Sequence, residues 1–128
     1  MNKPIEKIIK QRFSCRAYLD KPIDENYQRL LMDFLESNRI GPLGTHARFA
    51  LVAATEYDRK SLTGLGTYGF IKNATGFIVG ALEQGSKNLE DYGYLIEHTV
   101  LFATDLGLGT CWLGGSFTKS SFSKKISA

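Results

Sequence analysis

The sequence predicts an α+β fold, because helical and strand-like segments follow one another without the regular alternation of a parallel α/β sheet. Apolar residues recur at helical spacing in three segments, and two short, continuous apolar runs are typical of buried strands. The length of 128 residues suits one domain, or part of one. We therefore expect a single domain over residues 1–128 in which helices cover a small sheet.

Three main helices are expected. The first spans residues 4–11, and the second follows Asp24, a good N-cap residue, and fades at residues 37–38. The third spans residues 90–106 and is apolar on several faces, so it should be buried at the centre of the fold. Gly107 is expected in the left-handed conformation that ends this helix.

Three short strands are expected, at residues 49–54, 76–82 and 110–113. The first two are apolar runs of the kind that forms buried strands, and the third follows the central helix. Three strands would make a thin sheet. The remaining expected elements are short helices at residues 58–62 and 118–126.

Composition excludes several classes of protein. The chain is 43% hydrophobic and 23% charged, as globular proteins are. Its net charge of +3 lacks the dense basic stripe of a nucleic-acid binder. No apolar run approaches the length of a membrane span, and the N-terminus lacks the apolar core of a signal peptide. We therefore expect a cytoplasmic protein without nucleic-acid or membrane partners.

The cysteines and histidines indicate neither a disulfide framework nor a metal site. Cys15 and Cys111 belong to no Cys-x-x-Cys pair, and His46 and His98 show no ligand spacing with them. We expect core thiols for both cysteines, and a core histidine at position 98. The chain also has no convincing nucleophile–base pair or carboxylate dyad.

The first candidate ligand-binding segment is residues 12–18. Two guanidiniums and a hydroxyl, from Arg12, Arg16 and Ser14, suit a phosphate or a polarised carbonyl. If the segment is extended, these side chains share one face, and Phe13 and Cys15 face the core. The alternative is a solvated basic turn.

The second segment is a glycine-rich run, residues 107–115, with four glycines in nine residues. Gly114 and Gly115 follow Leu113 and leave the backbone bare of side chains. Bare backbone allows close approach of a flat or phosphorylated ligand, with N–H groups free to donate. The alternative is a helix C-cap followed by a tight turn.

Together these segments resemble the nitroreductase-type flavoproteins. The resemblance rests on Arg12-x-Ser14-x-Arg16-x-Tyr18, on the glycine-rich run after the central helix, and on residues 65–72 and 91–97, all in the family's order. The chain looks most similar to the N-terminal half of single-chain nitroreductases that fuse two related halves. The resemblance implies a small, mostly antiparallel sheet around a buried central helix, flanked by helices.

The resemblance also implies an FMN site. The family's first Arg and Ser reach the phosphate and ribityl chain, and its second basic residue reaches the pyrimidine edge of the flavin. These positions are Arg12, Ser14 and Arg16. In the family, the backbone N–H groups of the glycine-rich run donate hydrogen bonds toward N5 and O4 of the flavin ring. The cofactor-binding residues implied here are Leu113, Gly114 and Gly115.

A loop after the second helix packs, in the family, over the flavin of the partner subunit. Pro42 and Gly44 match this loop, whereas Leu43 and His46 replace the family's usual Ser and Asn. The match implies cofactor contacts from Pro42 and Gly44. The polar contacts across the subunits are in doubt.

The implied function is an FMN-dependent oxidoreductase that passes electrons from NAD(P)H to a small electron-poor acceptor, such as a nitroaromatic or a quinone. The flavin carries the chemistry, so no catalytic side chain is expected. No Gly-x-Gly-x-x-Gly fingerprint follows a strand, which favours transient stacking of the nicotinamide on the flavin. The alternatives are a non-catalytic FMN-binding domain and a half-domain that needs a partner to bind flavin.

The expected partner is a second copy of the chain or a missing C-terminal half. In the family the flavin lies between two halves, and this chain resembles one of them. Residues 92–102 of the central helix are apolar on more faces than one small sheet can cover, which indicates an interface. The chain also stops within an expected polar helix, so truncation at the C-terminus is the second expectation.

Overall fold

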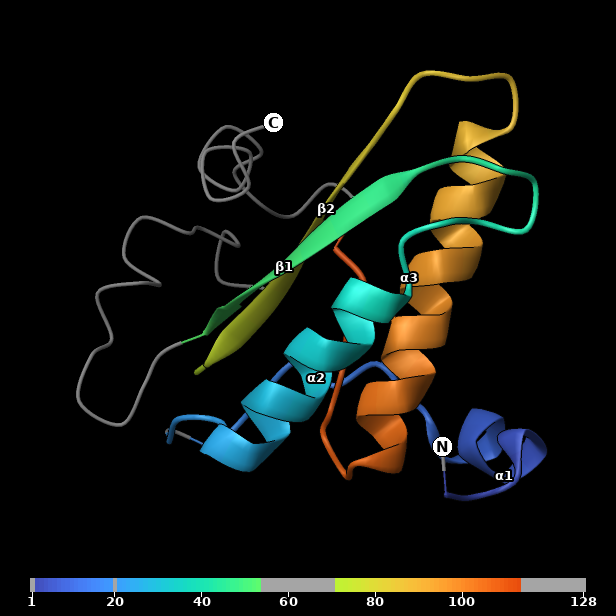
Figure 1. Ribbon diagram of the computed structural model, residues 1–128. Coiled ribbons are helices and arrows are strands. Elements are labelled where there is room, and N and C mark those ends of the chain that lie inside the picture. Colours follow the sequence, from blue (N-terminus) through green and yellow to red (C-terminus); the bar gives the residue numbers. More distant parts are fainter. Residues whose placement is uncertain (1, 20, 54–70, 114–128) are drawn as a thin grey trace.

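The computed structural model describes residues 2–19, 21–53 and 71–113. These residues form three α-helices and a two-stranded sheet (Figure 1). The elements in chain order are α1 (Ile5–Gln11), α2 (Glu25–Ser37), β1 (Ala47–Ala53), β2 (Gly76–Leu82) and α3 (Asn88–Asp105). The predicted α+β class is confirmed. The short helices expected at residues 58–62 and 118–126 lie outside the described residues.

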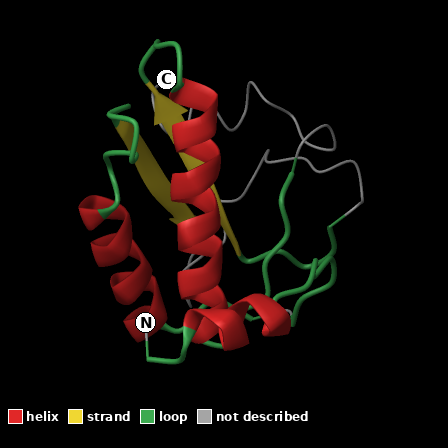
Figure 2. Ribbon diagram, turned by 90° about the vertical axis from the view of Figure 1, so that its right-hand side faces the viewer, coloured by secondary structure: helices red, strands yellow, loops and turns green. Residues whose placement is uncertain are grey.

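The helices and the sheet form two layers. Both α2 and α3 lie over the same face of the sheet, and α1 crosses the C-terminal end of α3 (Figure 2). Helix α2 packs mainly on β1, and α3 contacts β2, α2 and α1. Helix α3 is therefore the central element, as the resemblance implies.

The sheet is antiparallel, with Ala47 opposite Leu82 and Ala53 opposite Gly76. The prediction of β2 is confirmed to the residue, and β1 begins two residues earlier than expected. The prediction of a third strand at residues 110–113 is wrong. Thr110 forms only an isolated parallel bridge with Ser14. Its backbone pairs with the short segment around Ser14 and not with β2, so these residues do not join the sheet.

Capping residues mark the start of α2 and the end of α3 at the positions that the sequence predicts. The Asp24 carboxylate accepts a hydrogen bond from the Asn26 N–H at 2.8 Å and caps α2. Helix α3 ends at Asp105, and Gly107, two residues later, has a left-handed φ of +88°. The Gly107 N–H donates to Thr104 at 2.9 Å and the Leu108 N–H to Ala103 at 3.0 Å. This paired geometry satisfies two carbonyls of the last turn of the helix.

The core lies between the helices and one face of the sheet. Helix α3 contributes the largest share of its buried hydrophobic residues, namely Leu95, Ile96, Val100 and Ala103. Residue His98, expected in the core, is only half-buried and meets the ring of Phe34 edge-on, with centroids 5.1 Å apart. Among the described helices, none is both long and apolar enough to cross a membrane.

Candidate functional site

The segment from Arg12 to Tyr18 is extended, the first of the two conformations considered for it, and backbone hydrogen bonds hold it on two sides. The Cys15 N–H donates to the Thr110 carbonyl at 2.8 Å. Farther along, the Tyr18 N–H donates to Lys72 at 3.0 Å and the Lys72 N–H to Arg16 at 2.9 Å. The segment thus lies between two regions that are distant in the sequence.

The polar side chains of this segment cluster around Arg12. Its guanidinium donates to the Thr110 hydroxyl and to the Ser14 hydroxyl, each at 3.4 Å. Arg12 is half-buried, whereas Ser14 and Arg16 are exposed. We refer to Arg12, Ser14 and Arg16 as the anion clamp. Within the described residues neither arginine is paired with a carboxylate, so both keep donors for a ligand.

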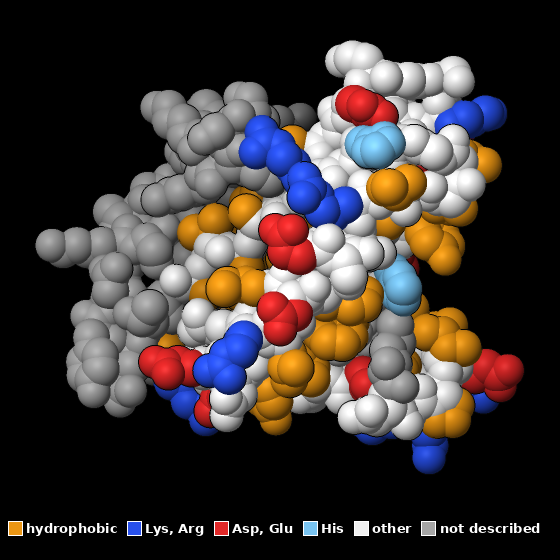
Figure 3. Space-filling model, viewed as in Figure 1, with side chains coloured by type: hydrophobic (Ala, Val, Ile, Leu, Met, Phe, Trp, Pro, Cys, Tyr) orange, Lys and Arg blue, Asp and Glu red, His pale blue; other side chains and the backbone are white. Residues whose placement is uncertain are grey.

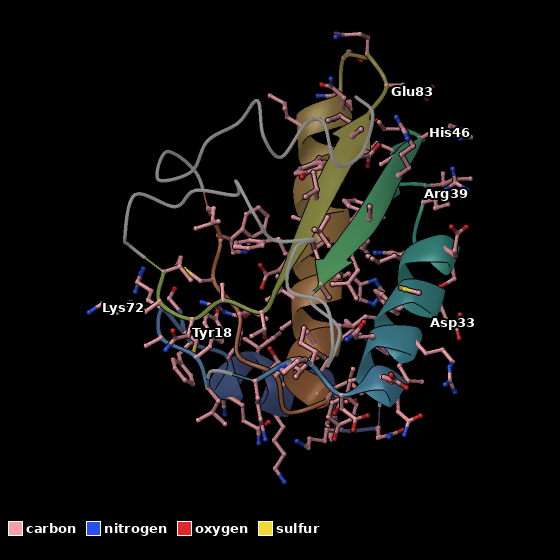
Figure 4. The ribbon with its side chains drawn as sticks, turned by 90° about the vertical axis from the view of Figure 1, so that its left-hand side faces the viewer. Tyr18, Asp33, Arg39, His46, Lys72 and Glu83 are labelled. Carbon is pink, nitrogen blue, oxygen red and sulfur yellow. The ribbon has the colours of Figure 1, made fainter. Side chains whose placement is uncertain are left out.

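Lys72 brings a further positive charge to this end of the molecule. Its backbone pairs with the clamp segment through the bridge to Ala17, and its side chain is exposed. Figure 4 shows Tyr18 and Lys72 at the same end, away from His46 and Glu83. The sequence alone left the role of Lys72 unassigned, and the fold sets it beside Arg16.

Two predictions about the core side of the segment are wrong. Phe13 is 66% exposed, because the segment runs along an edge of the molecule and no described element covers this ring. Cys15 and Cys111 are half-buried and not core thiols. The clamp segment is therefore held by its backbone more than by apolar packing.

Tyr18 closes the segment. Its hydroxyl donates to the Cys15 carbonyl at 2.6 Å. Burial raises the pKa of Tyr18 above its ordinary value, and the nearby Cys15 and Cys111 thiols raise it further. The phenol therefore stays neutral in the physiological range and acts as a hydrogen-bond donor that fixes the local backbone.

A cavity of about 490 Å³ lies next to the clamp. Its walls come from β2, α3 and residues 108–113, and most of the lining side chains are apolar. Thr110 connects the two features, because it lines the cavity and its hydroxyl accepts from Arg12. Leu113, predicted to bind cofactor, also lines the cavity. The volume is in the range of cavities that hold small organic ligands.

Trp112 stands at the same cavity and is 46% exposed, so it is not a core tryptophan. Its indole N–H donates to the Glu97 carboxylate at 2.9 Å. This bond orients the ring and leaves part of it open to solvent. The arrangement is compatible with stacking against a flat ligand.

The opposite end of α3 holds a buried carboxylate that sequence reasoning missed. Asp91 has no solvent exposure and accepts hydrogen bonds from the N–H groups of Leu43 and Thr45, at 2.9 and 2.8 Å. Burial disfavours its charge, but the Thr45 hydroxyl and these two N–H groups outweigh burial and hold the pKa of Asp91 below its ordinary value. Gly41 packs directly against this carboxyl group.

Pro42 and Gly44 lie in this loop, at the N-terminal end of α3, and both are exposed. Gly44 has a left-handed φ of +94°. Arg12 follows α1, which crosses the C-terminal end of α3 (Figure 2), and a helix of 18 residues is about 27 Å long. Within one chain the fold therefore keeps Pro42 and Gly44 away from Arg12. Gly114 and Gly115 lie outside the described residues.

The sequence carries only weak signals for the residues that it missed. Thr110 stands one position after a glycine, and nothing local marks it as a partner of Arg12. Asp91 is the better case, because it is an acidic residue in a largely apolar helix and a Gly-Pro-x-Gly loop precedes it. In the described parts of the chain, no three His, Cys, Asp or Glu side chains gather as a metal site would require.

Comparisons with known proteins agree with this architecture. The sequence of residues 4–128 matches the family described as "Putative TM nitroreductase". The crystal structure of a nitroreductase family protein from Clostridium difficile 630 superposes with a TM-score of 0.66 at 20% identity, covering 98% of this chain and 76% of that one. No curated protein matches the sequence. The chain belongs to this nitroreductase family, and the predicted nitroreductase-like fold is confirmed.

Proposed function

We propose that this nitroreductase family protein binds FMN and passes electrons from NAD(P)H to a small electron-poor acceptor, such as a nitroaromatic or a quinone. Family membership supports an oxidoreductase role. The observation that carries the finer proposal is the meeting of Arg12 and Ser14 with Thr110, from a segment 98 residues away, at the edge of an apolar cavity.

The residues present fit FMN. The two guanidiniums and the hydroxyl of the clamp are the donors that a phosphate prefers. The cavity is largely apolar and shares Thr110 with the clamp, and it suits a flat ring system. A cationic rim beside an apolar cavity matches the two ends of a flavin mononucleotide.

The chain's own residues would bind and orient the cofactor. Arg12 and Arg16 would hold the phosphate and the pyrimidine edge, with Ser14 donating beside them. The apolar walls would exclude water from the ring. When bound, FMN would supply the hydride and electron transfer, so no side chain is assigned a catalytic role.

A second copy of the chain is the partner that we propose. The loop with Pro42 and Gly44 cannot reach the clamp of its own chain, but a two-fold dimer would let it serve the site of the other copy. Hydrophobic side chains are exposed around this loop and along α2 and α3, and Figure 3 shows such side chains gathered on this face. The exposed set includes Ile40, Leu43, Leu89 and Tyr94. A cytoplasmic location is part of the same proposal.

The test is an FMN titration of the purified chain, followed by flavin fluorescence, with wild type and Arg12→Ala. Each charge-assisted hydrogen bond to a phosphate is worth roughly 1.5–3 kcal/mol. Arg12→Ala should therefore raise the Kd for FMN by about ten- to a hundredfold. Arg29→Ala on α2 removes the same charge from an exposed site and should leave the Kd unchanged. Equal Kd values for all three proteins would overturn the clamp assignment.

Turnover separates the proposed enzyme from a non-catalytic FMN-binding domain. The loaded protein should oxidise NADH or NADPH when a nitroaromatic or a quinone is present. Stoichiometric flavin without oxidation of either nicotinamide would favour the binding domain. Light scattering should show a dimer, and a monomer that binds FMN stoichiometrically would contradict the proposed partner.

A further inference from the structure

The chain's two cysteines are far apart in the sequence but converge beside the anion clamp. Ser14 and Thr110 form a parallel bridge, and Cys15 and Cys111 are the next residues on the two segments. In parallel pairing, residues one step beyond a bridge stand opposite each other, on the face that the bridged residues do not use. The bridge therefore places the two cysteines on adjacent segments, each directly after a bridged residue.

The spacing of the two segments suits a covalent link. Paired strands lie about 4.8 Å apart, and disulfides join Cα atoms about 4.4–6.8 Å apart. The Cys15 side chain lies against the neighbouring segment, because a Cβ added to Gly109, two residues before Cys111, would lie 2.8 Å from its Sγ. Rotation about χ1 is the movement that a link between the two sulfur atoms would require of each cysteine.

Tyr18 lies near both thiols, and each contributes to the raised pKa of its phenol. Its phenol interacts electrostatically with both Cys15 and Cys111. Each thiol is free and half-buried and donates to a nearby carbonyl, Cys15 to Ala17 at 3.3 Å and Cys111 to Trp112 at 3.4 Å. Both are therefore available to a small oxidant. The sequence contains no other cysteine that could compete within the chain.

We propose that Cys15 and Cys111 form a reversible disulfide when a low-molecular-weight disulfide, such as oxidised glutathione, is the oxidant. One protein thiolate attacks the oxidant, forms a mixed disulfide and releases one thiol. The second protein thiolate attacks the protein sulfur of the mixed disulfide and releases the other thiol. The two cysteines lose two protons and two electrons, and the oxidant is reduced to two thiols.

This disulfide would regulate the anion clamp. Cys15 lies between Ser14 and Arg16, and Cys111 follows Thr110, which accepts from Arg12. A cross-link at this point removes conformational freedom before a ligand binds, which raises affinity. We expect the Kd for FMN to fall several-fold on oxidation. This consequence rests on the proposed function, whereas the disulfide itself does not.

The test uses the full chain, without flavin, in a buffer of reduced and oxidised glutathione. After alkylation of the remaining thiols, peptide mass mapping should find Cys15 joined to Cys111 within a monomer. Addition of a dithiol reductant should restore both thiols. Stable glutathione on either cysteine of the wild type, disulfides only between two chains, or two thiols that stay reduced would each overturn the proposal.

Single serine variants provide the matched controls. In Cys15→Ser and in Cys111→Ser the remaining thiol has no partner, so each should accumulate the mixed disulfide with glutathione. Oxidation should raise the thermal midpoint of the wild type and leave that of both variants unchanged. An equal rise in a variant would mean that the link between these two cysteines is not the cause.

The FMN titration then separates the two proposals. Equal Kd values for the reduced and the oxidised wild type would overturn the coupling to the clamp. Failure of both forms to bind FMN would overturn the proposed function and leave the mapped disulfide standing.

Discussion

The two ends of helix α3 hold polar groups in opposite ways. At the N-terminal end, the fully buried Asp91 accepts N–H donors at 2.8 and 2.9 Å from a loop that closes tightly over it. At the C-terminal end, Arg12 reaches two hydroxyls at 3.4 Å, and its neighbours Ser14 and Arg16 are exposed. At one end of the helix, therefore, the buried polar group has its hydrogen-bond partners within the protein. At the other end, guanidinium N–H donors remain available to a ligand.

This difference separates a structural role from a binding role. A buried carboxylate with short hydrogen bonds contributes to stability and has no capacity for a ligand. A half-buried guanidinium with long contacts, as in Arg12, and an exposed one, as in Arg16, contribute little to stability and can still bind a ligand. Mutations at the two ends should accordingly change different observables, namely the thermal midpoint at the Asp91 end and the affinity for FMN at the clamp end.

The largest effect should come from Asp91→Asn, because the amide cannot accept from Leu43 and Thr45 as a carboxylate does. We expect the largest fall in thermal midpoint of the variants proposed here, measured by calorimetry. Asp33→Asn, at an exposed site of α2, is the control and should melt like the wild type (Figure 4). A wild-type midpoint for Asp91→Asn would remove the contrast between the two ends of α3.

The effect of Asp91→Asn should also depend on pH. The pKa of Asp91 is lower in the folded protein than its ordinary value of 3.8, so its carboxylate stabilises the fold fully above that value. The contribution is lost as the pH falls through the folded pKa. The difference in midpoint between wild type and variant should therefore be constant near neutrality and shrink in acid, and a difference that grows in acid would contradict this assignment.

Gly41→Ala should have the next largest effect. The added Cβ would overlap the fully buried Asp91 carboxyl group, so the loop or this side chain would have to shift. Overpacking of this kind costs about 1–3 kcal/mol in the free energy of unfolding. Urea denaturation measures this change in the free energy of unfolding. An unchanged midpoint of urea denaturation would show that the loop does not close over Asp91 as described.

Thr110→Val tests the clamp end and should leave the thermal midpoint nearly unchanged. The valine keeps the shape and removes the hydroxyl that accepts from Arg12. A hydrogen bond of this kind is worth about 0.5–1.5 kcal/mol. We expect the Kd for FMN to rise by about two- to tenfold. A large loss of stability with normal FMN affinity would assign Thr110 to the fold and not to the clamp.

Gly93→Ala should have the smallest effect, and in the opposite direction. Nothing lies within 4 Å of a Cβ added at Gly93, which stands between the two ends of α3. Alanine in a helix is more stable than glycine by about 0.5–1 kcal/mol. The thermal midpoint should rise slightly with no change in FMN affinity. A fall would indicate that this position is covered, for example by a second copy of the chain.

The sequence predicted the elements well where the signals are local. The caps at Asp24 and Gly107 depend on residues within one or two turns, and both are confirmed. Strand β2 and the buried helix α3 followed from continuous apolar segments. The third strand was predicted wrongly, because an apolar run indicates that a segment is buried but does not indicate which backbone segment it pairs with.

The candidate site was predictable only in part. The clamp residues followed from their types and spacing, yet their partner Thr110 did not, because 98 residues separate it from Arg12. Phe13 was expected in the core from strand alternation, but alternation cannot tell which face another element will cover. The hydrogen bond between the Leu43 N–H and the Asp91 carboxylate was missed for the same reason as the Thr110 contact, because 48 residues separate the two partners.

By itself, then, the sequence determined the α+β class, the helix ends and the family, since periodicity, capping and motif order act along the chain. Tertiary structure alone decided that Asp91 is an internal anchor, that Arg12 meets Thr110, and that the two cysteines converge. These contacts form only when α3 and the clamp segment pack together. Their geometry depends on the three-dimensional arrangement of the backbone and not on the spacing of residues in the sequence.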